Sequence, residues 1–147
     1  MKIIRDWFYA IAVCRKYKIM WNPLFFKDSA EFHFTYYKNY KKWRGVVRIQ
    51  PFYRGFLDSF LHEVGNCVSL RNAYMKADSI LEFQYNTQDK LKEEYKAWQF
   101  SKLALKGRFN NRRARAMFST YLPGIIDKQG EEQAMMAFAN YDRRLRK

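Results

Sequence analysis

Apolar residues recur at intervals of three and four along several stretches of the chain, and this spacing predicts amphipathic helices. Residues 1–18 predict a packed first helix, with an apolar stripe at Ile3, Ile4, Trp7, Phe8, Ile11 and Val13 or Cys14. Residues 56–70 predict a second helix, with apolar positions at Phe56, Phe60, Val64, Cys67 and Val68. Pro23 ends the first helical pattern, and Pro51 precedes the second.

Between these two helices the pattern changes to alternation, which indicates β-strands. Residues 31–38 alternate and are rich in aromatic side chains, and residues 43–51 are rich in β-branched residues. The intervening residues 39–42 have the composition of a turn. The sequence therefore predicts a small antiparallel sheet, and residues 18–21 are a candidate third strand.

The rest of the chain is predicted to be helical. Residues 72–89 have the composition of a loop with a short helix in its middle. Residues 87–106 predict a strong helix with Thr87 as N-cap, Gly107 as terminator and an apolar face at Leu91, Tyr95, Trp98 and Leu105. Two more helices are expected at 110–122, ending at Pro123-Gly124, and at 127–147. This order predicts a single α+β domain over residues 1–147, mainly helical, with the small antiparallel sheet ahead of the helix at 56–70.

The charge of the chain favours an anionic partner. Its formal net charge is +14, from 28 basic and 14 acidic residues, and such an excess attracts nucleic acid, acidic proteins or anionic lipid. The candidate nucleic-acid-binding residues are Arg108, Arg112, Arg113 and Arg115, and a solvated helix face is the alternative left open. A second candidate surface interleaves rings and bases, for which core rings between solvated lysines are the favoured reading: Tyr36, Tyr37, Tyr40 and Trp43 with Lys38, Lys41, Lys42 and Arg44.

The two cysteines, Cys14 and Cys67, lie among apolar neighbours and form no C-x-x-C pair, so the sequence offers no thiolate zinc site. We expect buried free thiols, with a disulfide left open. No apolar run approaches about 20 residues, so we expect no membrane-spanning helix and a cytoplasmic protein.

One motif suggests chemistry. His62-Glu63-Val64-Gly65-Asn66 differs by a single residue from the zinc-protease pattern H-E-x-x-H. Residues four apart stand on the same face of a helix, where two imidazoles can hold one zinc ion. In that pattern the glutamate beside the first histidine acts as general base on a metal-bound water. A glycine in an apolar stripe, such as Gly65, also predicts that another backbone passes close to the helix.

With its neighbours, the motif resembles the small zincin-like metallopeptidases of phages and mobile elements. The likeness is carried by "VVRIQP", "FLHEVGN" and the E-x-x-A-x-x-F spacing of Glu94, Ala97 and Phe100, and it spans roughly residues 43–106. The resemblance implies that His62 and Glu94 are zinc ligands and that Glu63 is the general base, with Glu93 as the ligand if the register shifts by one. It further implies a protein or peptide substrate and, for a phage protein, the host cytoplasm.

Asn66 departs from the family pattern, because it occupies the second ligand position. An amide is a weak ligand for zinc and suits harder cations better. Three readings stay open: a pseudoenzyme, an enzyme with a weaker or different metal site, or a substitution peculiar to this sequence. The alternative function is a non-enzymatic basic protein that engages nucleic acid or a nucleic-acid-handling host protein.

Overall fold

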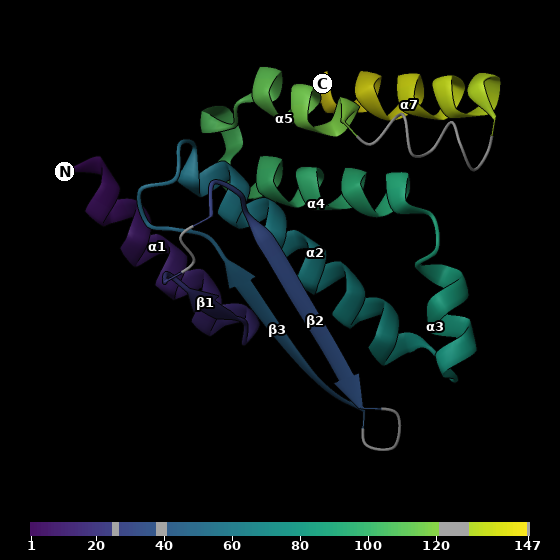
Figure 1. The fold of residues 1–147 in the computed structure, drawn as a ribbon, viewed down its shortest axis with the longest axis horizontal. Helices are drawn as coiled ribbons and strands as arrows, with labels where there is room; N and C mark the ends of the chain where they lie inside the picture. The colour runs from purple at the N-terminus through teal and green to yellow at the C-terminus, as the bar shows by residue number, and fades with distance from the viewer. Residues whose placement is uncertain (25–26, 38–40, 121–129, 147) are drawn as a thin grey trace.

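Figure 1 shows the computed structural model, which describes residues 1–24, 27–37, 41–120 and 130–146. In the described ranges the elements follow in the order α1 (Lys2–Tyr17), β1 (Met20–Asn22), β2 (Glu31–Tyr37), β3 (Lys42–Arg48), α2 (Phe56–Lys76), α3 (Ile80–Asn86), α4 (Lys90–Leu105), η1 (Lys106–Arg108), α5 (Asn111–Ser119) and α7 (Glu131–Arg146). The predicted fold class, α+β and mainly helical, is confirmed. The predicted turn at 39–42 and the helix end at Pro123-Gly124 fall wholly or partly outside the described residues.

The sheet is mixed, which corrects the antiparallel prediction. Its strand order is β1-β3-β2, with β2 antiparallel and β1 parallel to β3. The candidate third strand does form, and Met20 lies opposite Val46. The three strands run alternately up, down and up along the chain, and β3 inserts between the other two. The first and third strands are therefore neighbours that point the same way.

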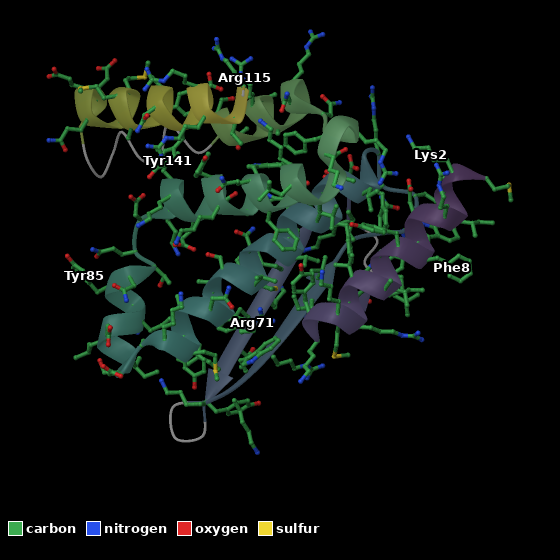
Figure 2. The ribbon with its side chains drawn as sticks, turned by 180° about the vertical axis from the view of Figure 1, so that it is seen from behind. Lys2, Phe8, Arg71, Tyr85, Arg115 and Tyr141 are labelled. Carbon is green, nitrogen blue, oxygen red and sulfur yellow. The ribbon has the colours of Figure 1, made fainter. Side chains whose placement is uncertain are left out.

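Helices α1 and α2 cover one face of the sheet. In Figure 2, which shows the molecule from behind, both helices lie in front of the strands. Gly45 and Val47 of β3 are buried toward this side, and a Cβ added at Gly45 would lie 3.2 Å from Cys67 Sγ of α2. A side chain at position 45 would push against α2, which lies directly on the strand at this point.

The closest approach between helices is that of α2 and α4, at Gly65. A Cβ added at Gly65 would lie 2.9 Å from the carbonyl oxygen of Ala97 and 3.0 Å from Phe100 Cβ. Such distances leave no room for a methyl group. The sequence prediction that another backbone passes close to Gly65 is confirmed, and that backbone belongs to the helix with the Glu94-x-x-Ala97-x-x-Phe100 spacing.

Aromatic rings fill the end of the sheet near α3. Tyr36 and Trp43 turn inward to a cluster built around the buried Tyr74 and Phe83, and Phe34 stacks on Trp43 with ring centroids 6.1 Å apart. This confirms the core reading of those two rings. Residues 38–40 of the same candidate surface lie outside the described part of the chain. Tyr37, on the opposite side of β2, keeps 54% of its surface exposed.

Several helix boundaries differ from the predictions for local reasons. Helix α2 continues through Lys76, where a loop was expected, because Tyr74 is anchored in the aromatic cluster. Asp89, not Thr87, caps α4, since its carboxylate accepts a hydrogen bond from the backbone N–H of Lys92. The Thr87 hydroxyl instead donates a hydrogen bond to the Phe83 carbonyl. The residue with positive φ that ends α4 is Lys106 (φ 52°), one position before the predicted Gly107.

The apolar stripe of α1 is only partly packed, contrary to prediction. Trp7, Ala10 and Val13 face the core, whereas Ile4 and Phe8 remain 39% and 68% exposed. Ile3 and Ile11 are exposed as well. The stripe is wider than the surface that α2 and the sheet offer to this helix, so its outer edge stays in solvent. Among the described residues, no helix has the length and apolarity needed to cross a membrane.

A second layer, of α5 and α7, covers α4. Its buried core consists of Leu91, Trp98, Ala114, Ala134 and Leu145. Within this layer Arg115 joins α5 to α7, because its Nε and Nη2 donate to the two carboxylate oxygens of Asp142 at 2.7 and 3.1 Å. These hydrogen bonds lower the pKa of Asp142.

We predict that Gly65→Ala destabilises the protein. Overpacking against the Ala97 backbone costs about 1–3 kcal/mol, and the better helix propensity of alanine offsets up to about 1 kcal/mol of that cost. Urea denaturation should therefore show a free energy of unfolding lower by roughly 1–2 kcal/mol. The control is Gly107→Ala, where an added Cβ meets nothing within 4 Å and stability should be unchanged or slightly higher. Equal effects of the two substitutions would contradict the close packing of α2 on α4.

Candidate functional site

The crossing of α2 and α4 brings three of the sequence-predicted site residues together. His62 Nε2 of α2 lies 2.8 Å from Glu94 Oε2 of α4. Asn66, one turn after His62, places its Nδ2 3.3 Å from the same ring nitrogen. The side chains of His62 and Glu94 are only 5% and 13% exposed. We call His62, Asn66 and Glu94 the His62 cluster.

Glu63 lies beside the His62 cluster. Asn66 Nδ2 donates a hydrogen bond to Glu63 Oε2 at 3.2 Å, so the same amide group approaches both His62 and Glu63. Burial raises the pKa of Glu63 to about 8; the hydrogen bond from Asn66 opposes this shift, and the nearby Glu94 adds to it. At neutral pH Glu63 is therefore largely protonated and is a poor proton acceptor.

Trp98 completes the surroundings of His62. Its ring packs edge-on against the imidazole, with centroids 4.1 Å apart. Burial lowers the pKa of His62 to about 3, so the ring is neutral at physiological pH. The contact with Glu94 thus does not join two full charges. From the sequence, Trp98 was assigned only to the apolar face of its helix. Its spacing of four from Glu94, which places both on one face of α4, was the available signal.

The fallback ligand Glu93 has other partners, and the second histidine of the chain, His33, lies on another surface. Glu93, the fallback for Glu94, accepts a hydrogen bond from Ser69 Oγ at 2.7 Å and pairs with Lys96 at 3.1 Å. His33 is exposed on the side of the sheet away from α2. Cys14 and Cys67 are both free, and burial raises their thiol pKa values to about 11 and about 12. The expectation of free thiols is confirmed.

The donor chemistry of the His62 cluster does not fit a zincin zinc site. His62 and Glu94 approach each other as two ligands would, but Asn66 turns an amide N–H toward the ring, and an N–H cannot coordinate a cation. A metal-binding histidine almost always donates its second ring N–H to a partner, yet His62 Nδ1 is buried without one among the described residues. Within that part of the chain, no group of three His, Cys, Asp or Glu side chains is placed to hold a metal ion.

The four arginines predicted to bind nucleic acid have different surroundings. Arg108 and Arg112 are exposed on η1 and α5. Arg115, labelled in Figure 2, is engaged by Asp142 of α7, and the side chain of Arg113 lies outside the described part of the structure. The structure therefore does not gather the four guanidinium groups on one described surface, and their role stays a prediction.

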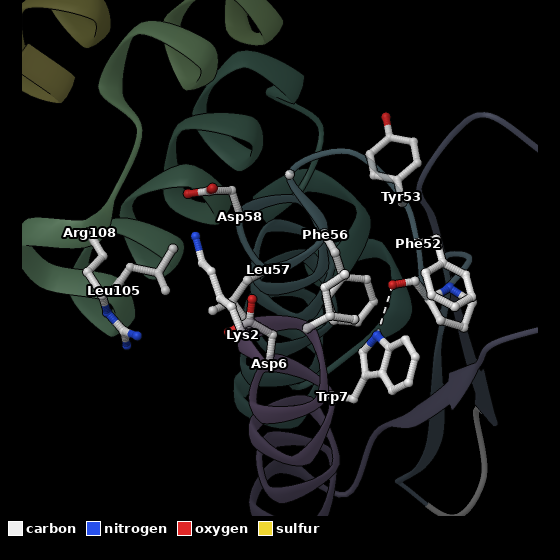
Figure 3. Close-up of a pocket in the computed structure, with 13 residues that line it drawn as sticks. Lys2, Asp6, Trp7, Phe52, Tyr53, Phe56, Leu57, Asp58, Leu105 and Arg108 are labelled. Carbon is white, nitrogen blue, oxygen red and sulfur yellow. Dashed lines mark hydrogen bonds between the residues drawn. The ribbon is translucent and has the colours of Figure 1, made fainter.

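A cavity of about 300 Å³ lies between the beginnings of α1 and α2, and it includes none of the His62 cluster (Figure 3). Trp7, Phe52 and Phe56 line one side, where Trp7 Nε1 donates a hydrogen bond to the Pro51 carbonyl at 2.9 Å. Charged groups of both signs line the other side: Lys2, Arg108, Asp6 and Asp58. This balance of charge gives the cavity no preference for an anion.

Comparison of the chain with models of protein families, with curated proteins and with solved structures finds no match.

We predict that Glu63 makes stability fall with rising pH above pH 6.5. The folded state keeps the Glu63 proton up to about pH 8, whereas the unfolded carboxyl loses it near 4.5, so stability declines between these values. His62 acts in the opposite direction, because its pKa falls from 6.5 to about 3 and stability increases with pH up to 6.5. Of these two contributions to the pH dependence of stability, the one from Glu63 is left between pH 6.5 and 8.

In chelator-treated protein, the free energy of unfolding of the parent should decline over that window by up to about 1.4 kcal/mol for each pH unit. Glu63→Gln should flatten the decline, and Glu132→Gln, at an exposed position of α7, should leave it intact. The same slope in the parent and in Glu63→Gln would show that Glu63 is not a buried, protonated carboxyl group.

Proposed function

We propose that this chain is a zincin-like domain of the metallopeptidase type with a degenerate site, which engages a protein or peptide without hydrolysing it. One observation carries the proposal. The crossing of α2 and α4 brings His62, Asn66 and Glu94 together as the zincin pattern requires, but the second ligand position holds an amide whose N–H points at His62. The arrangement favours a zincin scaffold, and the donor set disfavours zinc.

The surroundings of the His62 cluster support a role without catalysis. His62 and Asn66 are 4% and 5% exposed, and Trp98 covers the imidazole ring. Hydrolysis there would require a substrate carbonyl to enter the space beside His62, and this burial leaves little access to it. Glu63, the predicted general base, has a pKa raised to about 8 and so carries a proton at neutral pH. An active enzyme with a weaker or different metal site is the competing hypothesis.

We predict that the parent protein binds zinc substoichiometrically and that Asn66→His binds one zinc ion per chain. A second imidazole four residues after His62 supplies the missing nitrogen ligand on the same helix face. Metal content is measured by mass spectrometry after removal of metal and dialysis against zinc. Thermal unfolding provides a second readout, because a ligand at a hundred times its Kd adds about 2.7 kcal/mol of stability.

Two variants locate the zinc. Glu94→Gln added to Asn66→His should lower its zinc content, since it removes the predicted carboxylate ligand. The matched control is Asn72→His, which places a histidine at an exposed position of the same helix and should bind no more zinc than the parent.

Two results would contradict the proposal. Stoichiometric zinc in the parent, lost in His62→Ala and accompanied by peptide hydrolysis, would favour a working peptidase. No zinc in folded Asn66→His would reject the zincin-like assignment itself.

A further inference from the structure

The face of the sheet opposite α1 and α2 is left open by the described elements. In Figure 1 this face turns toward the viewer. In Figure 2, seen from behind, α1 and α2 lie in front of the sheet and hide this face. Alternate residues of β2 and β3 point away from the core, and we call their surface the open sheet face: Glu31, His33, Thr35, Tyr37, Lys42, Arg44, Val46 and Arg48. Because the inward residues fill the aromatic and aliphatic cores, this outward set is not needed for packing.

A groove of about 470 Å³ runs over the open sheet face between β1 and β2. Arg44 and Arg48 of β3 and His33 of β2 line it, and its described lining includes no aspartate or glutamate. The nearest acid along the strands is Glu31, which lies opposite Arg48 in the strand register and 3.6 Å from His33. Glu31 is one carboxylate beside two arginines, so the groove keeps a net positive charge.

The two arginines of the groove are not neutralised by ion pairs within the described residues. Arg48 Nε is buried without a hydrogen-bond partner there, and Arg44 Nη2 lies 3.6 Å from Met20 Sδ, a weak acceptor. Arg115 shows the contrast, since its Nε and Nη2 both donate to the Asp142 carboxylate. A guanidinium group without a carboxylate partner is suited to an anionic ligand, because charge-assisted hydrogen bonds are the strong ones.

We propose that the open sheet face binds single-stranded nucleic acid through its phosphates. Lys42, Arg44 and Arg48 stand two and four residues apart on one side of β3, so the shortest step is about 6.7 Å from the rise of a strand. An extended nucleic-acid backbone repeats its phosphates on a similar scale. A guanidinium group can grip a phosphate with two hydrogen bonds, which suits Arg44 and Arg48 to this ligand.

The exposed ring of Tyr37 adds a contact for a base. It lies opposite Lys42 in the strand register, beside the cations, and a base that leaves the stack can pack on such a ring whatever its sequence. Of the rings that the sequence interleaves with bases, Tyr36 and Trp43 face the core, so Tyr37 is the described ring left for this role. This proposal does not rest on the His62 cluster, because α2 covers the opposite side of the sheet.

The test measures fluorescence anisotropy of a labelled oligothymidine with the parent and with the double variant Arg44→Gln/Arg48→Gln. Affinity should fall roughly tenfold or more. The slope of log K against log salt should become shallower by about 1.4, which is 0.7 for each of the two phosphates that the variant no longer neutralises. Tyr37→Leu should weaken binding and leave the salt slope unchanged, because stacking releases no counterions.

The control, Lys90→Gln/Lys92→Gln, removes the same charge from exposed positions of α4 and should retain most of the affinity. Circular dichroism and urea unfolding confirm that each variant is folded. Equal losses in the groove and control variants would overturn the proposal, since net charge alone would then govern binding. Tighter binding to a duplex of the same length would overturn it too.

Two further results would reassign the surface. If Arg108→Gln/Arg112→Gln abolishes binding while the groove variant retains it, the site lies on η1 and α5, and the proposal fails. If the parent ignores oligothymidine but binds phosphatidylserine vesicles through Arg44 and Arg48, the groove recognises lipid phosphate, and the proposal fails as well.

Discussion

The close approach of α2 to α4 at Gly65 is the constraint on which the rest of the structure depends. With Ala97 and Phe100 against a residue that has no side chain, the two helix backbones come nearer than any larger residue would allow. Residues of the candidate site lie on both helices at this contact. His62 and Asn66 flank Gly65 on α2, and Glu94 precedes Ala97 by one turn on α4. The short distance between His62 and Glu94 is thus a consequence of the helix packing.

The two sides of α2 face different parts of the molecule. Toward the sheet, Cys67 lies against Gly45 of β3, the strand whose Arg44 and Arg48 have the outward register. Toward the C-terminal layer, Trp98 of α4 contacts the His62 ring and also joins the core shared with α5 and α7. The buried His62 cluster therefore lies on the helical side of the sheet. The cationic groove lies on the opposite face, because strand alternation turns Arg44 and Arg48 away from α2.

Local patterns in the sequence predicted the elements well and their surroundings less well. The spacing of apolar residues placed α1, α2 and α4, and the pairing of β2 with β3 followed from two adjacent alternating segments. The glycine at position 65 also predicted the close approach of another backbone, which the structure identifies as α4. Residues 18–21 were a candidate third strand, but their parallel pairing with β3 could not be predicted, since strand order depends on which edge of the sheet the chain enters. The apolar stripe on α1 also did not show which of its residues would be packed. Trp7 and Phe8 are adjacent in sequence, yet Trp7 donates a hydrogen bond to the Pro51 carbonyl and Phe8 stays exposed.

For the candidate site, the sequence identified the residues that meet but not their protonation. Glu94 rather than Glu93 reaches His62, because Glu93 faces Ser69 across the helix pair. Two carboxyl groups, Glu63 and Glu94, then share a poorly hydrated space, and such a pair requires a compensating positive charge or a proton. In a zincin the dication supplies that charge. Under the degenerate reading, the Asn66 amide and the proton on Glu63, whose pKa is raised to about 8, take its place. Asn66 and the raised pKa of Glu63 would then act together, because both replace the positive charge that a zinc ion supplies in a zincin.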